Sequence, residues 1–172
     1  MGDKITIERA TLAETDLLSE MHEDVARWLW SRGIRQWEPG ELPREWLIAC
    51  IERGETYLAS LDGEPAGMVI LQDSDEAVWG AQPSDALYVH GLCARRLYAG
   101  RGVGRAILRW AEEQVGARGR MYLRLDCMAE NAKLRAYYED AGFRHVADKT
   151  YEKDPSWRSS LYKKRVAVTR AE

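Results

Sequence analysis

Three glycines within five residues, Gly100, Gly102 and Gly104, separate a mostly apolar segment from an amphipathic one. Residues 87–94 are typical of a buried strand, and apolar side chains recur at helical spacing over residues 103–115. Glycine adopts backbone conformations that other residues avoid, and the first amides of a helix attract anions. The segment therefore predicts a strand, a tight turn and a helix in succession, with a turn that can hold a phosphate group.

Two common phosphate-binding motifs do not fit this turn. A P-loop requires GxxxxGK[ST], but Arg105 comes five residues after Gly100 and no Lys-Ser/Thr pair is present. A dinucleotide-binding turn requires GxGxxG, and here the third glycine comes one residue early, although Asp126 stands where its acidic residue is expected. If this segment is considered alone, the alternative interpretation is a tight turn that binds no ligand. Five arginines lie near the turn in sequence: Arg95, Arg96, Arg101, Arg105 and Arg109.

The rest of the chain mixes strand and helix patterns. Thr11 and Glu14 predict a capping box for a helix that ends before Gly33, and the dipeptide Asp62-Gly63 predicts a hairpin turn. The order of elements predicts an α/β (α+β) fold in mixed layers, and residues 1–172 suit a single domain. Strands are expected at residues 4–8, 56–61, 66–71, 122–127, 143–146 and 161–168, helices at 42–50 and 132–141, and a loop at 73–85.

The turn and a second segment together resemble the GNAT acetyltransferase superfamily. In that family a strand is followed by [QR]xxGx[GA] and a helix, and residues 87–108 are similar to this arrangement. Residues 131–143 are similar to the family's NxxAxxxYxxxGF motif, with Leu134 in place of the usual alanine. Two motifs in the right order are more specific than either alone. Ala99 departs from the family pattern, because it occupies the place of the usual glutamine or arginine.

The resemblance implies a single-domain GNAT-like fold and acetyl-CoA as co-substrate. The expected fold has a central mixed, mostly antiparallel sheet with a splayed parallel strand pair, flanked by about four helices. The pyrophosphate is expected over the amides of residues 100–105, and the pantetheine arm along Leu92, Cys93 and Ala94, where a backbone amide would polarise the thioester carbonyl. The cofactor-binding residues implied are Leu92, Cys93, Ala94, Ala99, Gly100, Arg101, Gly102, Val103, Gly104, Arg105 and Asn131. Arg96 or Arg101 can compensate for Ala99.

The resemblance also suggests how an amine would be acetylated. Tyr138 is the candidate general acid for the departing thiolate, since a phenol with a pKa of about 10 stays protonated at neutral pH. Asn131 lies two helical turns before it and also suits a helix N-cap. His90, with an ordinary pKa of about 6.5, is a possible base. The alternatives are a hydrogen-bonded strand histidine without a catalytic role, a water relay, or one of the acids Asp73, Asp75, Glu76 and Asp85.

Catalysis by a cysteine nucleophile is not expected. Cys93 and Cys127 are interpreted as small buried side chains, because no Cys-His pair is evident. Direct attack by the amine on the thioester is therefore favoured over a covalent acyl-enzyme. The general function predicted is an N-acetyltransferase that acts on a primary amine of a small molecule or peptide, and the alternative is a catalytically silent CoA-binding or sensing module.

The aromatic residues include seven Trp and eight Tyr but a single Phe, which favours rings that carry a polar group. Trp28 and Trp46 fall at helical core spacing and are expected to pack inside. The rings at element ends or in loops are better candidates for an amine pocket, with cation–π attraction as the physical reason. The candidate substrate residues are Trp30, Trp37, Trp79 and Tyr88.

Composition excludes several other classes of protein. No apolar run approaches the roughly 20 residues of a membrane span, and the first ten residues lack a signal-peptide core. The net charge of −3 does not favour nucleic acid as a partner, and neither a disulfide framework nor a metal site is expected from three Cys and three His without ligand spacing. The expectation is a cytoplasmic enzyme without membrane or nucleic-acid partners, with a homodimer left open.

Overall fold

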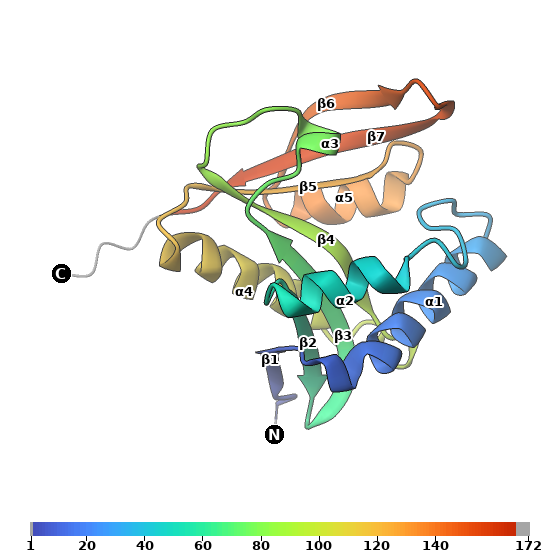
Figure 1. Ribbon diagram of the computed structural model, residues 1–172, viewed down its shortest axis with the longest axis vertical. Coiled ribbons are helices and arrows are strands. Elements are labelled where there is room, and N and C mark those ends of the chain that lie inside the picture. The colour runs from blue at the N-terminus through green and yellow to red at the C-terminus, as the bar shows by residue number, and fades with distance from the viewer. Residues whose placement is uncertain (1, 168–172) are drawn as a thin grey trace. The chain divides into compact units, whose positions relative to one another are not determined.

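A computed structural model describes residues 2–167 of the chain (Figure 1). The chain divides into two compact units, the first made of Met1–Leu71 and His90–Trp110 and the second of Gln72–Val89 and Ala111–Glu172. Strand β4 (Ala86–Ala94) and helix α4 (Val103–Ala117) each pass from one unit into the other. The prediction of one domain over residues 1–172 stays a prediction.

The first unit is built on antiparallel strands. β1 (Ile5–Arg9) pairs with β2 (Thr56–Leu61), which pairs with β3 (Glu64–Gln72). The turn between β2 and β3 has left-handed backbone at both Asp62 (φ 51°) and Gly63 (φ 87°), as a type I′ hairpin requires. The Asp-Gly prediction is therefore confirmed.

The second unit contains the parallel pair. β4 pairs in parallel with β5 (Tyr122–Met128) through residues 86–88 and 122–124, whereas both strands continue beyond these pairs. β5 is antiparallel to β7 (Asp154–Arg165), which is antiparallel to β6 (Arg144–Tyr151). Within the described residues the strand order is β1-β2-β3-β4-β5-β7-β6. The predicted mixed, mostly antiparallel sheet with one parallel pair is confirmed.

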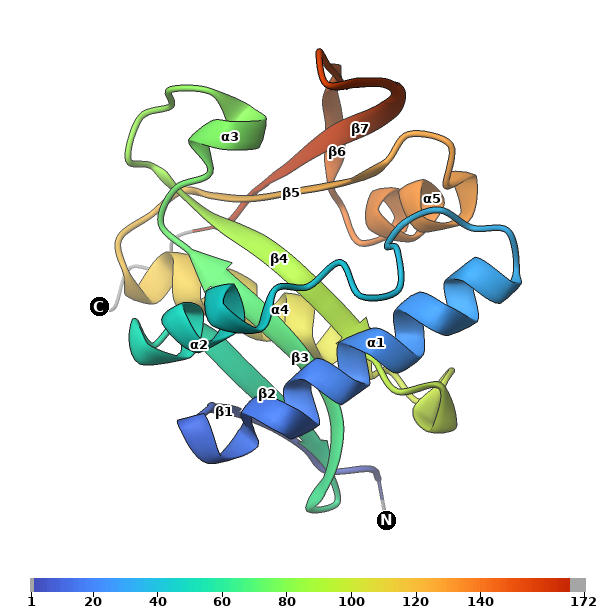
Figure 2. The same cartoon turned by 45° about the vertical axis from the view of Figure 1, so that its right-hand side comes forward.

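Helices cover both faces of β3 in the first unit (Figure 2). α1 (Thr15–Ser31) and α2 (Arg44–Glu52) pack on the face that carries Met68 and Ile70, and they contribute Leu18, Met21 and Leu47 to the same buried cluster. On the other face, a Cβ added at Gly67 would lie 3.1 Å from Val103 and 3.3 Å from Ile107 of α4. Alternate residues of one strand thus serve two helical layers.

The start of α1 shows the predicted capping interaction. A short 3₁₀ turn at Leu12–Glu14 precedes the helix, and the Glu14 carboxylate accepts hydrogen bonds from the Thr11 backbone N–H and hydroxyl. The remaining helices are α3 (Glu76–Trp79) and α5 (Ala132–Asp140), and a second 3₁₀ turn covers Arg96–Tyr98. No helix among residues 2–167 is both long enough and apolar enough to span a bilayer.

Three expectations from sequence were wrong in detail. The segment 73–85 is not entirely a loop, because α3 forms one helical turn there, with the Asp75 carboxylate accepting from the backbone N–H of Val78 at 3.3 Å. β7 begins at Asp154 rather than near Leu161, since its first half is polar and pairs with the equally polar β6. Trp46 is 38% exposed, because its side chain lies on the outer face of α2.

Candidate active site

The glycine-rich turn joins β4 to α4 in the first unit, as predicted. Gly100 and Gly102 have φ angles of 77° and 79°, in the left-handed region that other residues rarely adopt. A Cβ added at either glycine would meet no atom within 4 Å, so the turn requires these glycines for backbone conformation rather than for packing. α4 begins at Val103, and the N–H groups of its first turn have no acceptor within the helix. The geometry suits an anionic ligand.

Both arginines expected to compensate for Ala99 are engaged within the first unit. The Arg101 guanidinium donates from Nε and Nη2 to the Asp3 carboxylate, at 2.9 and 2.5 Å. Arg101 accordingly holds the pKa of the Asp3 carboxyl below its usual range. The Arg96 guanidinium stacks on Trp28, with its central carbon 3.7 Å from the ring centroid. A ligand phosphate would therefore compete with Asp3 for Arg101.

The last residues of β4 are shaped by two glycines. Gly91 has a φ of 56°, and a left-handed residue inside a strand marks a bulge where backbone groups leave the regular ladder. A Cβ at Gly67 of β3 would lie 2.6 Å from the carbonyl oxygen of Cys93, so β3 and β4 approach closely at this point. The predicted donor-binding residues Leu92, Cys93 and Ala94 follow directly after the bulge.

Tyr138 lies in the second unit and is 5% exposed. Its ring packs edge-on against Phe143, with centroids 5.9 Å apart, and against Tyr137 at 5.7 Å. Burial, together with the neighbouring Cys127 and Asp126, raises the pKa of the Tyr138 phenol well above its usual range. The hydroxyl is therefore in its protonated form at physiological pH.

Asn131 begins the helix that carries Tyr138. Its side-chain oxygen accepts a hydrogen bond from the backbone N–H of Leu134 at 3.2 Å, which makes Asn131 the N-cap of α5. The N-cap interpretation from sequence is thus confirmed. Its cofactor role stays a prediction.

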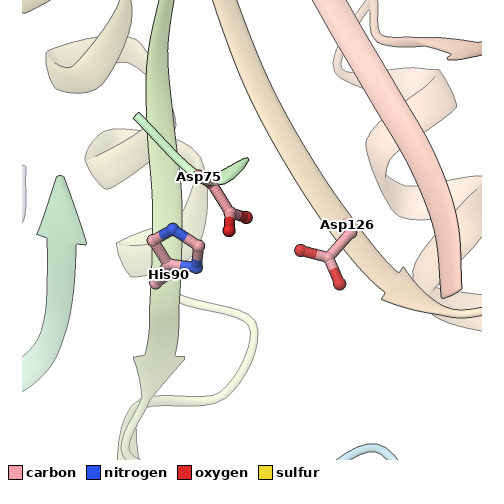
Figure 3. Close-up of side chains that lie close together, drawn as sticks. All are labelled: Asp75, His90 and Asp126. Atoms are coloured by element: carbon pink, nitrogen blue, oxygen red, sulfur yellow. The ribbon is translucent and has the colours of Figure 1, made fainter. Parts of the chain in front are cut away.

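The proposed base and the acids that are alternatives to it come from several elements. His90 is half-buried and follows Val89 on β4 (Figure 3). In the second unit, carboxylate oxygens of Asp75 and Asp126 lie within 4.8 Å of each other (Figure 3). Sequence reasoning noticed Asp126 only as a feature of a motif that failed. Its place on β5, directly after the buried residues Leu123–Leu125, gave no stronger signal.

The other candidate acids have different surroundings. Asp73 pairs with Arg120 at 3.2 Å, and Asp85 pairs with Arg124 at 3.3 Å, so both carboxylates are engaged in ion pairs. Glu76 is exposed in the first turn of α3.

The cysteines are buried free thiols. Burial raises the pKa of Cys93 to about 12 and, with the nearby Asp126 as a smaller cause, that of Cys127 also to about 12. A thiol with such a pKa carries almost no thiolate at neutral pH. This agrees with the interpretation that neither cysteine is a nucleophile.

The four candidate substrate residues differ in exposure. Trp30 is 46% exposed and lies under the Arg35 guanidinium, whereas Trp37 stacks on His22 with centroids 4.3 Å apart. Trp79 is half-buried, and Tyr88, 3% exposed, is the most enclosed of the four. The first unit holds Trp30 and Trp37 with the glycine-rich turn, and the second holds Trp79 and Tyr88 with Tyr138.

Arg124 is a charged residue of the second unit that sequence reasoning did not select. It is 5% exposed, donates to the Tyr88 hydroxyl at 2.7 Å and pairs with Asp85. Its guanidinium carbon lies 5.3 to 5.7 Å from the ring centroids of Trp79, Tyr88 and Tyr122. The alternation Leu123-Arg124-Leu125 would by itself place Arg124 on the exposed face of the strand, so the sequence offered no local signal that this charge is buried.

The chain is similar in sequence to known acetyltransferases. The family model described as "Acetyltransferase (GNAT) family" matches residues 22–143. The "Uncharacterized N-acetyltransferase YesJ" of Bacillus subtilis (strain 168) is 32% identical to this chain over 129 residues, which are 70% of this chain and 71% of that protein.

Two solved structures are similar in fold. An acetyltransferase of the GNAT family from Listeria monocytogenes 4b F2365 superposes with a TM-score of 0.77 and 24% identity, covering 94% of each chain. YncA, a putative acetyltransferase from Salmonella typhimurium solved with acetyl-CoA, superposes with a TM-score of 0.70 and 14% identity, covering 98% of each chain.

Proposed function

The chain belongs to the acetyltransferase (GNAT) family and is an acetyl-CoA-dependent acyltransferase, and from this premise we propose that it acetylates a primary amine of a small molecule or peptide. In the proposed reaction the amine attacks the acetyl thioester directly. The N–C bond forms as the C–S bond breaks, the leaving thiolate takes a proton, and the amine loses one.

The observation that carries this proposal is the conformation of the turn before α4. Two left-handed glycines, Gly100 and Gly102, bring the backbone into the first turn of a helix, where unsatisfied N–H groups and the helix dipole favour a pyrophosphate. We assign pyrophosphate binding to the backbone of Ala99, Gly100, Arg101, Gly102, Val103, Gly104 and Arg105. Ala99 is tolerated in this assignment because the backbone supplies the donors.

The end of β4 is assigned to the acyl donor. When bound, acetyl-CoA supplies the thioester carbonyl that the amine attacks. The bulge at Gly91 turns backbone groups out of the strand ladder immediately before Leu92, Cys93 and Ala94, which supports their pairing with an extended pantetheine arm. An amide in this segment would stabilise negative charge that develops on the carbonyl oxygen.

Tyr138 is assigned as the general acid. Burial keeps its hydroxyl protonated, and general acids of this kind contribute about 10²- to 10⁴-fold to rate. Asn131 acts through the helix, because its cap fixes the start of α5 and so the position of Tyr138 seven residues later. A cofactor contact of Asn131 is compatible with the same cap.

His90 is our candidate for the base that accepts the amine proton. It lies on β4 two residues before Leu92, and an imidazole suits proton transfer near neutral pH. Asp75 is the alternative among the acids, because Asp73 and Asp85 are committed to arginines.

The acceptor side is assigned to aromatic residues. Trp30, Trp37 and Trp79 offer exposed or half-buried ring surface that attracts a cationic amine. Tyr88 is buried and packs edge-on against Trp79, with ring centroids 6.1 Å apart. This contact helps to fix the position of the Trp79 ring. Three free thiols are consistent with our proposal of a reducing, cytoplasmic location. A homodimer is not required by any step.

A thiol-release assay tests the proposal. The protein is incubated with acetyl-CoA and a panel of amines, amino acids and peptides, and free CoA is measured. Amine-dependent release together with acetylated product supports the assignment. Stabilisation of the fold by acetyl-CoA, measured as a raised Tm, without release of CoA for any amine would instead favour a silent CoA-binding or sensing module.

A further inference from the structure

The segment between β3 and β4 is held within the second unit by three basic side chains from other parts of that unit. This segment, Asp73–Asp85, contains α3 and four acidic residues, and it is called the strap below. Figure 1 shows it as the green loop that carries α3 beside β6 and β7. Connections of this length without extended secondary structure are uncommon inside compact domains and are often functional.

Arg120 ties together the two ends of the strap. Its Nη2 lies 3.2 Å from the Asp73 carboxylate, and its Nη1 donates to the carbonyl oxygen of Ser84. Arg120 comes from the connection between α4 and β5, and its side chain is 25% exposed. One guanidinium thus closes the segment into a loop with fixed ends.

Lys149 of β6 holds the middle of the strap. Its ammonium donates to the carbonyl oxygens of Ala77 and Val78, at 2.5 and 3.1 Å. These carbonyls belong to α3, and a cation near helix carbonyls is stabilising. Lys149 therefore fixes the helical turn that carries Trp79.

Arg124 holds the inner side of the strap. It pairs with Asp85 and lies 5.3 Å from the Trp79 ring, and it is buried. The strap also has its own internal bonds, from Val78 N–H to Asp75 and from Gln82 to the carbonyl oxygen of Trp79. Trp79 is thus positioned from several sides.

The strap reaches the surroundings of the proposed acid. It places a carboxylate oxygen of Asp75 within 4.8 Å of one of Asp126 on β5. Asp126 in turn is one of the groups that raise the pKa of Tyr138. The residues that fasten the strap thereby hold Asp75 in place beside Asp126.

We propose that the strap forms one wall of the acceptor site and that Arg120, Arg124 and Lys149 are positioning residues whose hold on it sets the affinity for the acceptor amine. This inference rests on the proposed function. Individual partly exposed ion pairs are weak, so the strap is held by several small contributions and can loosen without unfolding of the unit.

The test uses Lys149→Met, because Lys149 is partly exposed and touches the strap only at backbone carbonyls, whereas loss of the buried Arg124 would endanger folding. The expected result is an acceptor KM raised about three- to tenfold, with the KM for acetyl-CoA and kcat within about twofold of the parent. Lys149→Arg, which keeps the cation, should restore most of the acceptor affinity. Lys153→Met is the matched control, since it removes the same charge from an exposed residue in the turn between β6 and β7.

Hydrogen exchange of the strap amides gives a readout that does not depend on turnover. Exchange should be faster in Lys149→Met and in a second variant, Arg120→Met, but unchanged in Lys153→Met. Unchanged exchange in both strap variants, or faster exchange with an unaltered acceptor KM, would overturn the inference while leaving the proposed function intact. A parent protein that turns over no amine would instead defeat the proposed function, and the inference with it.

Discussion

Arg101 and Asp3 are joined by two hydrogen bonds between a guanidinium edge and a carboxylate, although 98 residues separate them in the sequence. Arg101 also lies 3.9 Å from Asp62 in the β2–β3 turn. The arginine next to the glycine-rich turn is thereby turned toward the protein's own acids. An anionic donor molecule that uses Arg101 must first displace them.

Replacement of Asp3 by asparagine should tighten acetyl-CoA binding. Without this carboxylate, Arg101 becomes available to a phosphate of the ligand. The expected effect is a decrease in Kd of about two- to fivefold, which corresponds to the free-energy contribution of an exposed ion pair. Isothermal titration with acetyl-CoA measures it. Arg101→Ala should weaken binding, and Asp3→Asn should have no effect in the Arg101→Ala background. An equal gain in both backgrounds would contradict competition for Arg101.

Replacement of Tyr138 by phenylalanine should lower kcat by about 10²- to 10⁴-fold with little change in acetyl-CoA affinity. The ring still packs on Phe143, so the fold is preserved, but the proton for the leaving thiolate is lost. Steady-state kinetics and a Tm measurement separate the two effects. Unchanged turnover at saturating substrates would remove Tyr138 from the acid role.

The kcat of the parent enzyme should not decrease on the alkaline side because of Tyr138. Burial raises the pKa of this phenol above its ordinary value of about 10, so the acid remains protonated throughout the measurable alkaline range. A pH profile of kcat up to about pH 9.5 checks this. A decrease that disappears in a Tyr138 variant with residual activity would show that the phenol ionises earlier than its burial implies.

Thiol reagents should leave the native enzyme active. Cys93 and Cys127 are buried, and their pKa values of about 12 leave almost no thiolate to react at neutral pH. Incubation with iodoacetamide, followed by mass spectrometry and an activity assay, is the measurement.

Steady-state kinetics with both substrates varied should give intersecting rather than parallel double-reciprocal lines, because direct transfer needs both substrates bound together. A ping-pong pattern with an acetylated cysteine would exclude direct transfer.

Stability should fall as the pH is lowered from about 6.5 to about 4, in part because of His22. This side chain is 4% exposed, and burial lowers its pKa to about 4, against a smaller opposing effect of Glu23. Above about pH 6.5 the imidazole of His22 is neutral in both the folded and the unfolded protein. Below about pH 6.5 the imidazole of the unfolded chain binds a proton while that of the folded protein does not, so the unfolded state is favoured. The full effect is on the order of 3 kcal/mol. Chemical denaturation at pH 7, 5.5 and 4.5 should show a shallower decline for His22→Gln than for the parent.

Gly67→Ala should destabilise the fold by about 1 to 3 kcal/mol and weaken acetyl-CoA binding. The added methyl group would lie 2.6 Å from the carbonyl oxygen of Cys93, so β4 must shift where the donor is proposed to bind. Gly116→Ala is a suitable control, because a Cβ there meets nothing within 4 Å. Thermal unfolding and titration with acetyl-CoA measure the two effects, and a wild-type-like Gly67→Ala would contradict the close approach.

The parts of the fold that could be predicted are those with local signals. The Asp62-Gly63 turn, the Thr11–Glu14 capping interaction and the Asn131 cap each depend on a few neighbouring residues, and each is present in the structure. The strand β4 and helix α4 were also recognised because apolar periodicity marks them directly.

The parts that were missed depend on partners distant in sequence. A strand was expected at residues 143–146, but the continuation of β6 to Tyr151 and the first half of β7 are largely polar and mostly exposed, so their strand character comes from pairing with each other and not from an apolar pattern. The burial of Arg124 depends on three rings and Asp85. The proximity of Asp75 to Asp126 follows from the course of the strap, which no local spacing reveals.

β6 is the last strand in the described sheet order and has no further strand beside it. Such an edge is a template on which another chain can add a strand and start an aggregate. Here the first five residues of the strand are all exposed and include Arg144, His145 and Asp148. An incoming strand would have to bury these charged and polar groups. The charged and polar residues therefore disfavour the addition of a further strand along this edge.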